Sequence, residues 1–235
     1  MDSGNLDEAL SLFETALGLD PNAPDALLHR ANLNLLRINH KAAKADLERF
    51  LQLRPDNVLA QLRLATLYMA MENIDEAKKC LDKAEQIDPH SSEVHSYRGE
   101  MHFAQGKFEE ARAEFDRAIE CEAGNPTPYV NCALVIMNTP GPNMGPPDIP
   151  YAISLLEKAI EVDPHFHNAY VHLGQMKLSL ATDLTKAKEV ISLYDKGLKY
   201  CRTADDLKDI VSMRILAIAQ VDAAKALKMN TLNMQ

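Results

Sequence analysis

The side chains that could perform chemistry in this chain are its eight histidines, its four cysteines and several paired carboxylates. His165, His167 and His172 form the densest histidine cluster, but no Cys, Asp or Glu completes an obvious metal-ligand set around them. His95 and His102 lie seven residues apart on one predicted helix, where packing side chains are expected. We therefore interpret these histidines as structural and predict neither a metal nor a cofactor.

The cysteines and carboxylates give no stronger catalytic signal. Cys80, Cys121, Cys132 and Cys201 are separated by 41, 11 and 69 residues, which matches no zinc spacing and suggests no disulfide framework. No nucleophile elbow, metalloprotease motif or phosphate-binding glycine loop is present. The pair Glu109–Glu110 falls at a predicted helix start, where carboxylates favour the positive end of the helix dipole. We expect no enzymatic activity.

Composition excludes two further classes of protein. The 235 residues carry a formal net charge of -9 and contain no cluster of Lys and Arg, so phosphate contacts to a nucleic acid are not expected. The longest uninterrupted apolar run, Cys132–Met137, is far shorter than the roughly 20 residues that cross a bilayer. We predict a folded chain with no transmembrane segment and no nucleic-acid partner.

The elements that position these side chains repeat along the chain. Four similar segments begin at alanines spaced by 34 residues, namely Ala9, Ala43, Ala77 and Ala111. Three of the four segments end in prolines with the same spacing, Pro21, Pro55 and Pro89. A fifth copy begins at Ala152 after a step of 41 residues, and the excess matches a Pro/Gly-rich loop at 137–150.

Each repeat reads as two amphipathic helices joined by a tight turn. Small residues recur where the two helices must approach closely, and a proline ends the second helix because it cannot donate to the preceding turn. This pattern resembles the tetratricopeptide repeat, and it is carried by Tyr68, Gly99, Gly106, Ala111, Phe115, Ala118 and their equivalents in other copies. The resemblance implies an all-α fold, an α-solenoid forming a right-handed superhelix of helix hairpins with a C-terminal capping helix.

The repeat boundaries predict a single tetratricopeptide domain over 1–235. The expected parts are a truncated repeat at 1–23, repeats at 24–57, 58–91, 92–125, 126–166 and 167–204, and a capping helix at 205–229. Because the first repeat lacks its first helix, we expect the chain to be a fragment of a longer array.

Stacking of the repeats predicts a concave groove lined by one face of each first helix. Positions 2, 5, 9 and 12 share that face in a 3.6-residue period, together with some neighbouring positions. The predicted peptide-binding residues are Leu28, Asn32, Leu62, Thr66, Met69, Glu93, Tyr97, Glu100, Phe103, Val130, Asn131, Leu134, Met137, Val171 and Gln175. This groove is apolar with two carboxylates, which suits an apolar or amphipathic peptide with some positive charge. Alternatively, some of these side chains pack on a neighbouring helix or on the cap.

The groove lacks the carboxylate clamp that holds acidic EEVD chaperone tails in other tetratricopeptide arrays. The slots that would need Lys, Asn and Arg contain Leu28 and Asn32, then Arg63, then Glu93 and Tyr97. We expect no binding of EEVD tails, because a carboxylate stands where the clamp requires a cation.

The C-terminal part resembles a more specific family. Segments 125–136, 152–179 and 194–227 are similar to the end of the large tetratricopeptide receptors of the mitochondrial outer-membrane translocase. The resemblance implies a non-catalytic receptor domain on the cytosolic face of that membrane. Its expected partners are mitochondrial precursor proteins, bound through internal targeting segments or presequences for import, and other translocase subunits. Chaperones would bind only through a clamp domain outside this fragment.

Two other functions remain open at this point. A generic tetratricopeptide scaffold or co-chaperone module would show no preference for targeting peptides. The substrate-recruiting arm of a larger enzyme, such as a glycosyltransferase, would carry a ladder of concave asparagines, of which only Asn32, Asn131 and Asn168 are present.

Overall fold

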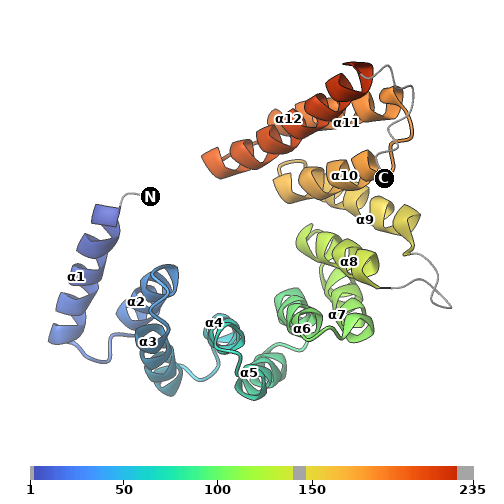
Figure 1. Cartoon of the computed structure of the whole chain (residues 1–235). Coiled ribbons are helices and arrows are strands. Elements are labelled where there is room, and N and C mark those ends of the chain that lie inside the picture. The colour runs from blue at the N-terminus through green and yellow to red at the C-terminus, as the bar shows by residue number, and fades with distance from the viewer. Residues whose placement is uncertain (1–2, 140–146, 227–235) are drawn as a thin grey trace. The chain divides into compact units, whose positions relative to one another are not determined.

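The computed structural model describes residues 3–139 and 147–226, and all twelve regular elements in these residues are α-helices (Figure 1). They are α1 (Ser3–Leu19), α2 (Pro24–Leu36), α3 (His40–Leu53), α4 (Val58–Ala70), α5 (Ile74–Ile87), α6 (Ser92–Ala104), α7 (Phe108–Cys121), α8 (Thr127–Asn138), α9 (Ile149–Val162), α10 (His167–Ser179), α11 (Leu184–Leu198) and α12 (Ala204–Ala226). The predicted all-α fold is confirmed.

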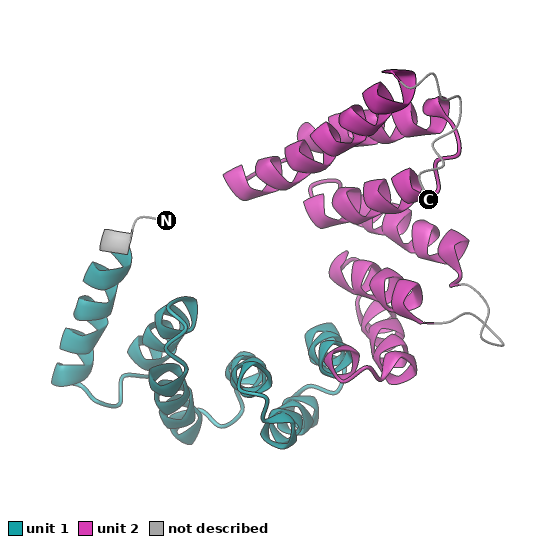
Figure 2. Ribbon diagram, in the orientation of Figure 1, with its two compact units in different colours: residues 1–101 teal, residues 102–235 magenta. Residues whose placement is uncertain are grey.

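The chain divides into two compact units, Met1–Met101 and His102–Gln235, which we call the N-terminal unit and the C-terminal unit (Figure 2). Helix α6 crosses this division. Consecutive helices pack as antiparallel hairpins within each unit, for example α2 with α3 and α4 with α5 in the first, and α8 with α9 in the second. The assignment of 1–235 to one domain stays a prediction.

Small side chains sit where the helices of a hairpin meet. Among the alanines that begin the repeated segments, Ala43, Ala77, Ala111 and Ala152 are fully buried, whereas Ala9 on α1 is half-buried. Leucines and aromatic residues fill the space around them, with Leu47 and Phe115 also almost fully buried. Each unit has its own hydrophobic core as a result.

Turns between the two helices of a repeat recur in the same conformation. Ile38, Glu72 and Gly106, which are 34 residues apart, adopt positive φ angles of 58°, 59° and 72°. Such angles are easy for glycine and unusual for a β-branched residue. The second helices end two residues before a proline, as α3 does before Pro55 and α5 before Pro89, as expected from the exclusion of the helical conformation there.

The expected loop at 137–150 and the expected cap at 205–229 both lie partly outside the described residues. Helix α8 extends to Asn138 and α9 begins at Ile149, so that part of the expected loop 137–150 is helical, and its residues 140–146 lie outside the described residues. Helix α12 packs on α10 and α11 through buried Ile210 and Ala217. The last residues of the expected cap, 227–229, are not among those described.

The start of the cap is held by a cluster of polar contacts. The Asp206 carboxylate accepts hydrogen bonds from the backbone N–H groups of Arg202 and Thr203, both at 3.1 Å, and the Thr203 hydroxyl accepts from the Asp206 N–H at 3.0 Å. His167 Nδ1 lies 3.1 Å from the same carboxylate. These contacts lower the pKa of Asp206, with the Thr203 hydroxyl as the largest cause.

Candidate peptide-binding surface

The predicted groove residues of the N-terminal unit differ in how much of their side chains reaches solvent. Thr66 and Glu93 are exposed, and Leu28, Asn32 and Met69 are half-buried. Leu28 also lines a pocket of about 350 Å³ at the start of α2. This surface is therefore mixed in polarity, with apolar side chains partly accessible beside polar ones.

Leu62 has a different position from its neighbours in the predicted set. Its side chain is only 1% exposed and belongs to the hydrophobic core of the N-terminal unit. Thr66, one turn further along α4, is exposed and donates its hydroxyl to the Leu62 carbonyl oxygen at 3.0 Å. Leu62 therefore packs in the core under this surface and is not accessible to a peptide.

Tyr97 is the centre of a charged cluster formed by α4 and α6. Burial raises the pKa of the Tyr97 phenol, and the nearby carboxylates of Glu100 and Glu93 raise it further, because each opposes a negative phenolate. Arg63 and Thr66 act in the opposite direction on the same pKa. These five residues are close enough to interact electrostatically, so the structure brings them together.

Arg63 is the member of this cluster that the predicted groove omits. It occupies the sixth position of its repeat, as Tyr97 and Asn131 do in later repeats, and this shared register was the signal that could have found it. Its Nε atom is buried and has no hydrogen-bond partner among the described residues. The surface therefore has a cation next to two carboxylates and can interact with peptide groups of either sign.

In the C-terminal unit, α8 contributes both core and surface. Val130 is 4% exposed and packs in the core, whereas Leu134 and Asn131 are half-buried and Met137 is 40% exposed. Phe103 is half-buried and packs edge-to-face on Phe108, with ring centroids 5.6 Å apart. Apolar area is thus accessible mainly near the C-terminal end of α8.

The cap reaches the predicted groove residues on α10. The amide of Gln175 donates to the sulfur of Met213 on α12 at 3.1 Å, and Val171 is half-buried against the core. Burial also lowers the pKa of His172 on this helix, because it disfavours the charged imidazolium. Part of this face is therefore occupied by the chain's own last helix.

The histidines and cysteines considered as metal ligands or nucleophiles lie in packing or hydrogen-bonded positions. No group of three or more His, Cys, Asp or Glu side chains in the described ranges is arranged to hold a metal ion. His165 Nδ1 lies 2.9 Å from the Tyr200 carbonyl oxygen. Burial raises the pKa of Cys80 to about 11 and that of Cys132 to about 12, which keeps both as neutral thiols at physiological pH.

Within residues 3–139 and 147–226, no helix is both long enough and apolar enough to cross a membrane.

The repeated hairpins define an all-helical repeat protein, and comparison with known proteins gives its family. A model described as a tetratricopeptide repeat-like domain matches residues 1–135, which is more than half of the chain. The chain therefore belongs to the tetratricopeptide repeat-like family, and the predicted resemblance is confirmed.

Individual proteins within this family are similar to the chain over most of its length. The chain is 25% identical over 220 residues to the human mitochondrial import receptor subunit TOM70, a match that covers 91% of this chain and 34% of the human protein, and the rat protein of the same name matches equally. The chain thus spans about a third of the length of the curated relatives it matches.

Solved structures show the same similarity. The crystal structure of yeast Tom70 superposes with a TM-score of 0.74 and 25% identity, covering 92% of this chain and 44% of the yeast chain. A tetratricopeptide repeat protein from Parabacteroides merdae reaches a TM-score of 0.68 at 20% identity, covering 90% of this chain and 78% of its own, and supports the fold alone.

Proposed function

We propose that this chain is a non-catalytic receptor domain that binds mitochondrial precursor proteins, through internal targeting segments or presequences, for import across the outer membrane. The observation that carries the proposal is the similarity to import receptor subunits over 91% of the chain. The whole protein would act at the cytosolic face of the outer membrane, with other translocase subunits as further partners. The binding domain would comprise 1–235.

The side chains of the predicted groove support this choice of ligand. Exposed Thr66 and half-buried Met69 on α4 provide contact area, and the carboxylate of Glu93 on α6 is exposed beside Tyr97. Apolar contacts bind the hydrophobic side of an amphipathic segment, while carboxylates attract its Lys and Arg side chains. In the C-terminal unit, Met137 and Leu134 would supply similar apolar contacts.

Titration of the purified chain with labelled peptides tests the proposal. The peptides are a basic amphipathic presequence, an internal targeting segment and an acidic peptide ending in EEVD, each measured by fluorescence anisotropy. We expect the first two to bind and the third not to bind, because a carboxylate at Glu93 occupies a clamp position. Thr66→Arg should weaken presequence binding about tenfold, since it adds bulk and a repelling charge.

Thr15→Arg on α1 is the matched control. Thr15 is exposed like Thr66, and its hydroxyl donates to the Ser11 carbonyl oxygen at 2.9 Å in the same way. This variant should bind as the unmodified chain does. Binding of the EEVD peptide in preference to both targeting peptides would refute the receptor proposal and favour the alternative, a generic scaffold or co-chaperone module.

A further inference from the structure

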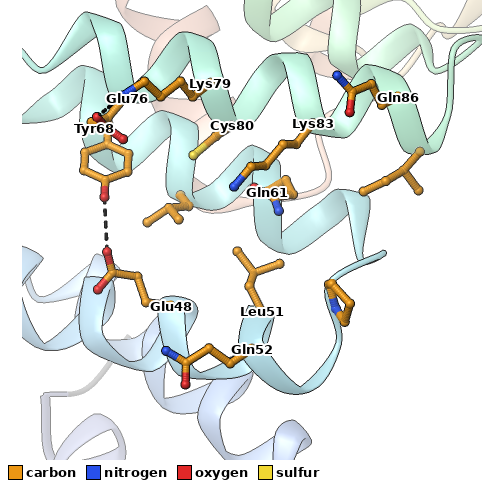
Figure 3. Close-up of a pocket in the computed structure, with 13 residues that line it drawn as sticks. Glu48, Leu51, Gln52, Gln61, Tyr68, Glu76, Lys79, Cys80, Lys83 and Gln86 are labelled. Carbon is orange, nitrogen blue, oxygen red and sulfur yellow. Dashed lines mark hydrogen bonds and ion pairs between the residues drawn. The ribbon is translucent and has the colours of Figure 1, made fainter.

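A pocket of about 650 Å³ lies on a different face of the N-terminal unit from the predicted groove. Its walls are α3 and α5, and its floor is α4 (Figure 3). Gln61 and Tyr68 of α4 line this pocket, whereas Thr66 lies on the opposite side of the same helix, as the 3.6-residue period requires. We call this space the α3–α5 pocket.

Gln61 gives the α3–α5 pocket a polar floor. Its side chain is only 5% exposed, lines the pocket, and forms no hydrogen bond with any other described residue. Figure 3 shows it pointing from α4 into the space next to Leu51 and Lys83. The amide atoms are not among the fully buried unpaired polar atoms of the described residues, so they are accessible and offer both a donor and an acceptor to a ligand in the pocket.

The charged side chains that line the pocket differ in whether they form ion pairs or hydrogen bonds. Lys79 is paired with Glu76 at 2.5 Å, and Glu48 accepts a hydrogen bond from the Tyr68 hydroxyl at 3.2 Å. Lys83, in contrast, is exposed and forms no ion pair within the part of the chain that the structure describes. Glu48 also lies 3.7 Å from Lys44. Both carboxylates of the pocket thus have a cationic partner, and Lys83, next to Gln61, is the lining cation with no ion pair among the described residues, although it also helps to lower the pKa of Glu76.

Apolar side chains complete the pocket near that charge. Leu51 of α3 is half-buried, Leu64 of α4 is 6% exposed, and Ile87 of α5 is 37% exposed, and all three line the space. A volume of this size lies within the range of ordinary ligand sites, which combine apolar walls with a few polar groups.

We propose that the α3–α5 pocket binds an extended peptide segment in which an apolar residue is followed by an acidic one. The Gln61 amide pairs with the N–H and C=O of one residue of the segment, which point to the same side of an extended chain and present the complementary donor and acceptor. The apolar side chain lies among Leu51, Leu64 and Ile87, and the carboxylate binds Lys83. This site is independent of the proposed receptor function, and its charge preference is opposite to that of a basic targeting peptide.

A pair of blocked heptapeptides tests the site in the full chain. The probe is acetyl-Gly-Ser-Leu-Asp-Leu-Ser-Gly-amide, and its comparison peptide has Lys in place of Asp. We expect the acidic probe to shift the Gln61 side-chain amide resonances and backbone resonances of α3, α4 and α5 in nitrogen–proton NMR spectra. The Lys peptide should bind about tenfold more weakly or not at all.

Three substitutions assign the contacts. Lys83→Gln should weaken the acidic probe about tenfold, whereas Lys78→Gln, at an exposed position of α5 that does not line the pocket, should leave it unchanged. Gln61→Leu should abolish the peptide shifts. The melting temperature of this variant without peptide shows whether it is folded.

Thr66→Arg tests the two proposals independently. It alters the other side of α4, so it should weaken binding of the presequence but leave binding of the acidic probe unchanged. Equal binding of the Asp and Lys peptides, or equal effects of Lys83→Gln and Lys78→Gln, would overturn the proposal. Absence of any shift in α3, α4 and α5 at millimolar peptide would do the same.

Discussion

Gly174 of α10 lies where this helix packs directly against the Tyr194 side chain of α11. A Cβ atom built on this residue would lie 2.3 Å from Cζ and Oη of Tyr194 on α11, well inside contact distance. The Tyr194 ring cannot withdraw easily, because it is fully buried and packed in the core. On the opposite helix, a Cβ on Gly197 would approach Tyr170 to 2.9 Å, so each helix accepts the other's tyrosine over a glycine.

Gly174→Ala should therefore destabilise the protein despite improving helix propensity. Forcing an extra carbon into a well-packed core costs about 1–3 kcal/mol, and the contact here calls for the upper end. Replacing a helical Gly with Ala contributes about 1 kcal/mol in the other direction. We expect a net loss of about 2 kcal/mol, which corresponds to a fall of about 4–8 °C in the melting temperature.

Urea unfolding followed by circular dichroism at 222 nm measures this loss. The matched control is Gly18→Ala in α1, where a Cβ would meet no atom within 4 Å, and this change should stabilise the protein by up to about 1 kcal/mol. In a Tyr194→Leu background, Gly174→Ala should cost little, because the clashing ring atoms are gone. A cost that persists in that background, or no cost in the native sequence, would refute the reasoning.

Two further predictions concern a turn and a helix cap. Ile38 is 76% exposed and has a φ of 58°, so Ile38→Gly should stabilise the protein by about 1 kcal/mol. Leu36→Gly within α2 should destabilise the protein by about the same amount. If both variants changed the free energy of urea unfolding in the same direction, this reasoning would be contradicted. The Asp183 carboxylate accepts hydrogen bonds at 2.9 Å from the N–H groups of Lys186 and Thr185, which lower its pKa. The stabilisation by this cap is thus present above the unfolded pKa and is lost as pH falls through the lower folded value. Asp183→Ala should therefore reduce the acid dependence of unfolding below about pH 4, and unchanged profiles between pH 2 and 7 would count against the cap.

The period of 34 residues made the fold predictable from sequence. Buried alanines such as Ala43 and Ala77, and the helix ends before Pro55 and Pro89, depend on steric rules that act over one or two turns. These rules need no knowledge of distant contacts. The helix-hairpin fold and the helices expected to carry a binding surface followed from them.

The solvent exposure of individual groove residues was less predictable, because the face of a helix on which a residue lies does not specify which other side chains cover it. Leu62 and Thr66 share one predicted face, yet the first is 1% exposed and the second is exposed. Gln175 meets Met213 from 38 residues away, a contact that no local pattern encodes. The predicted groove residues therefore differ in accessibility, and their role in binding stays a prediction.

The sequence by itself determined the repeat, the helix-hairpin fold and the family, since each rests on short-range sterics repeated in phase. Only the tertiary structure decided that Arg63 joins the Tyr97 cluster, that the cap contacts α10, and that Gln61 lines a pocket with no hydrogen-bond partner among the described residues. The physical reason is that burial and pairing depend on the side chains that other helices bring to the same place.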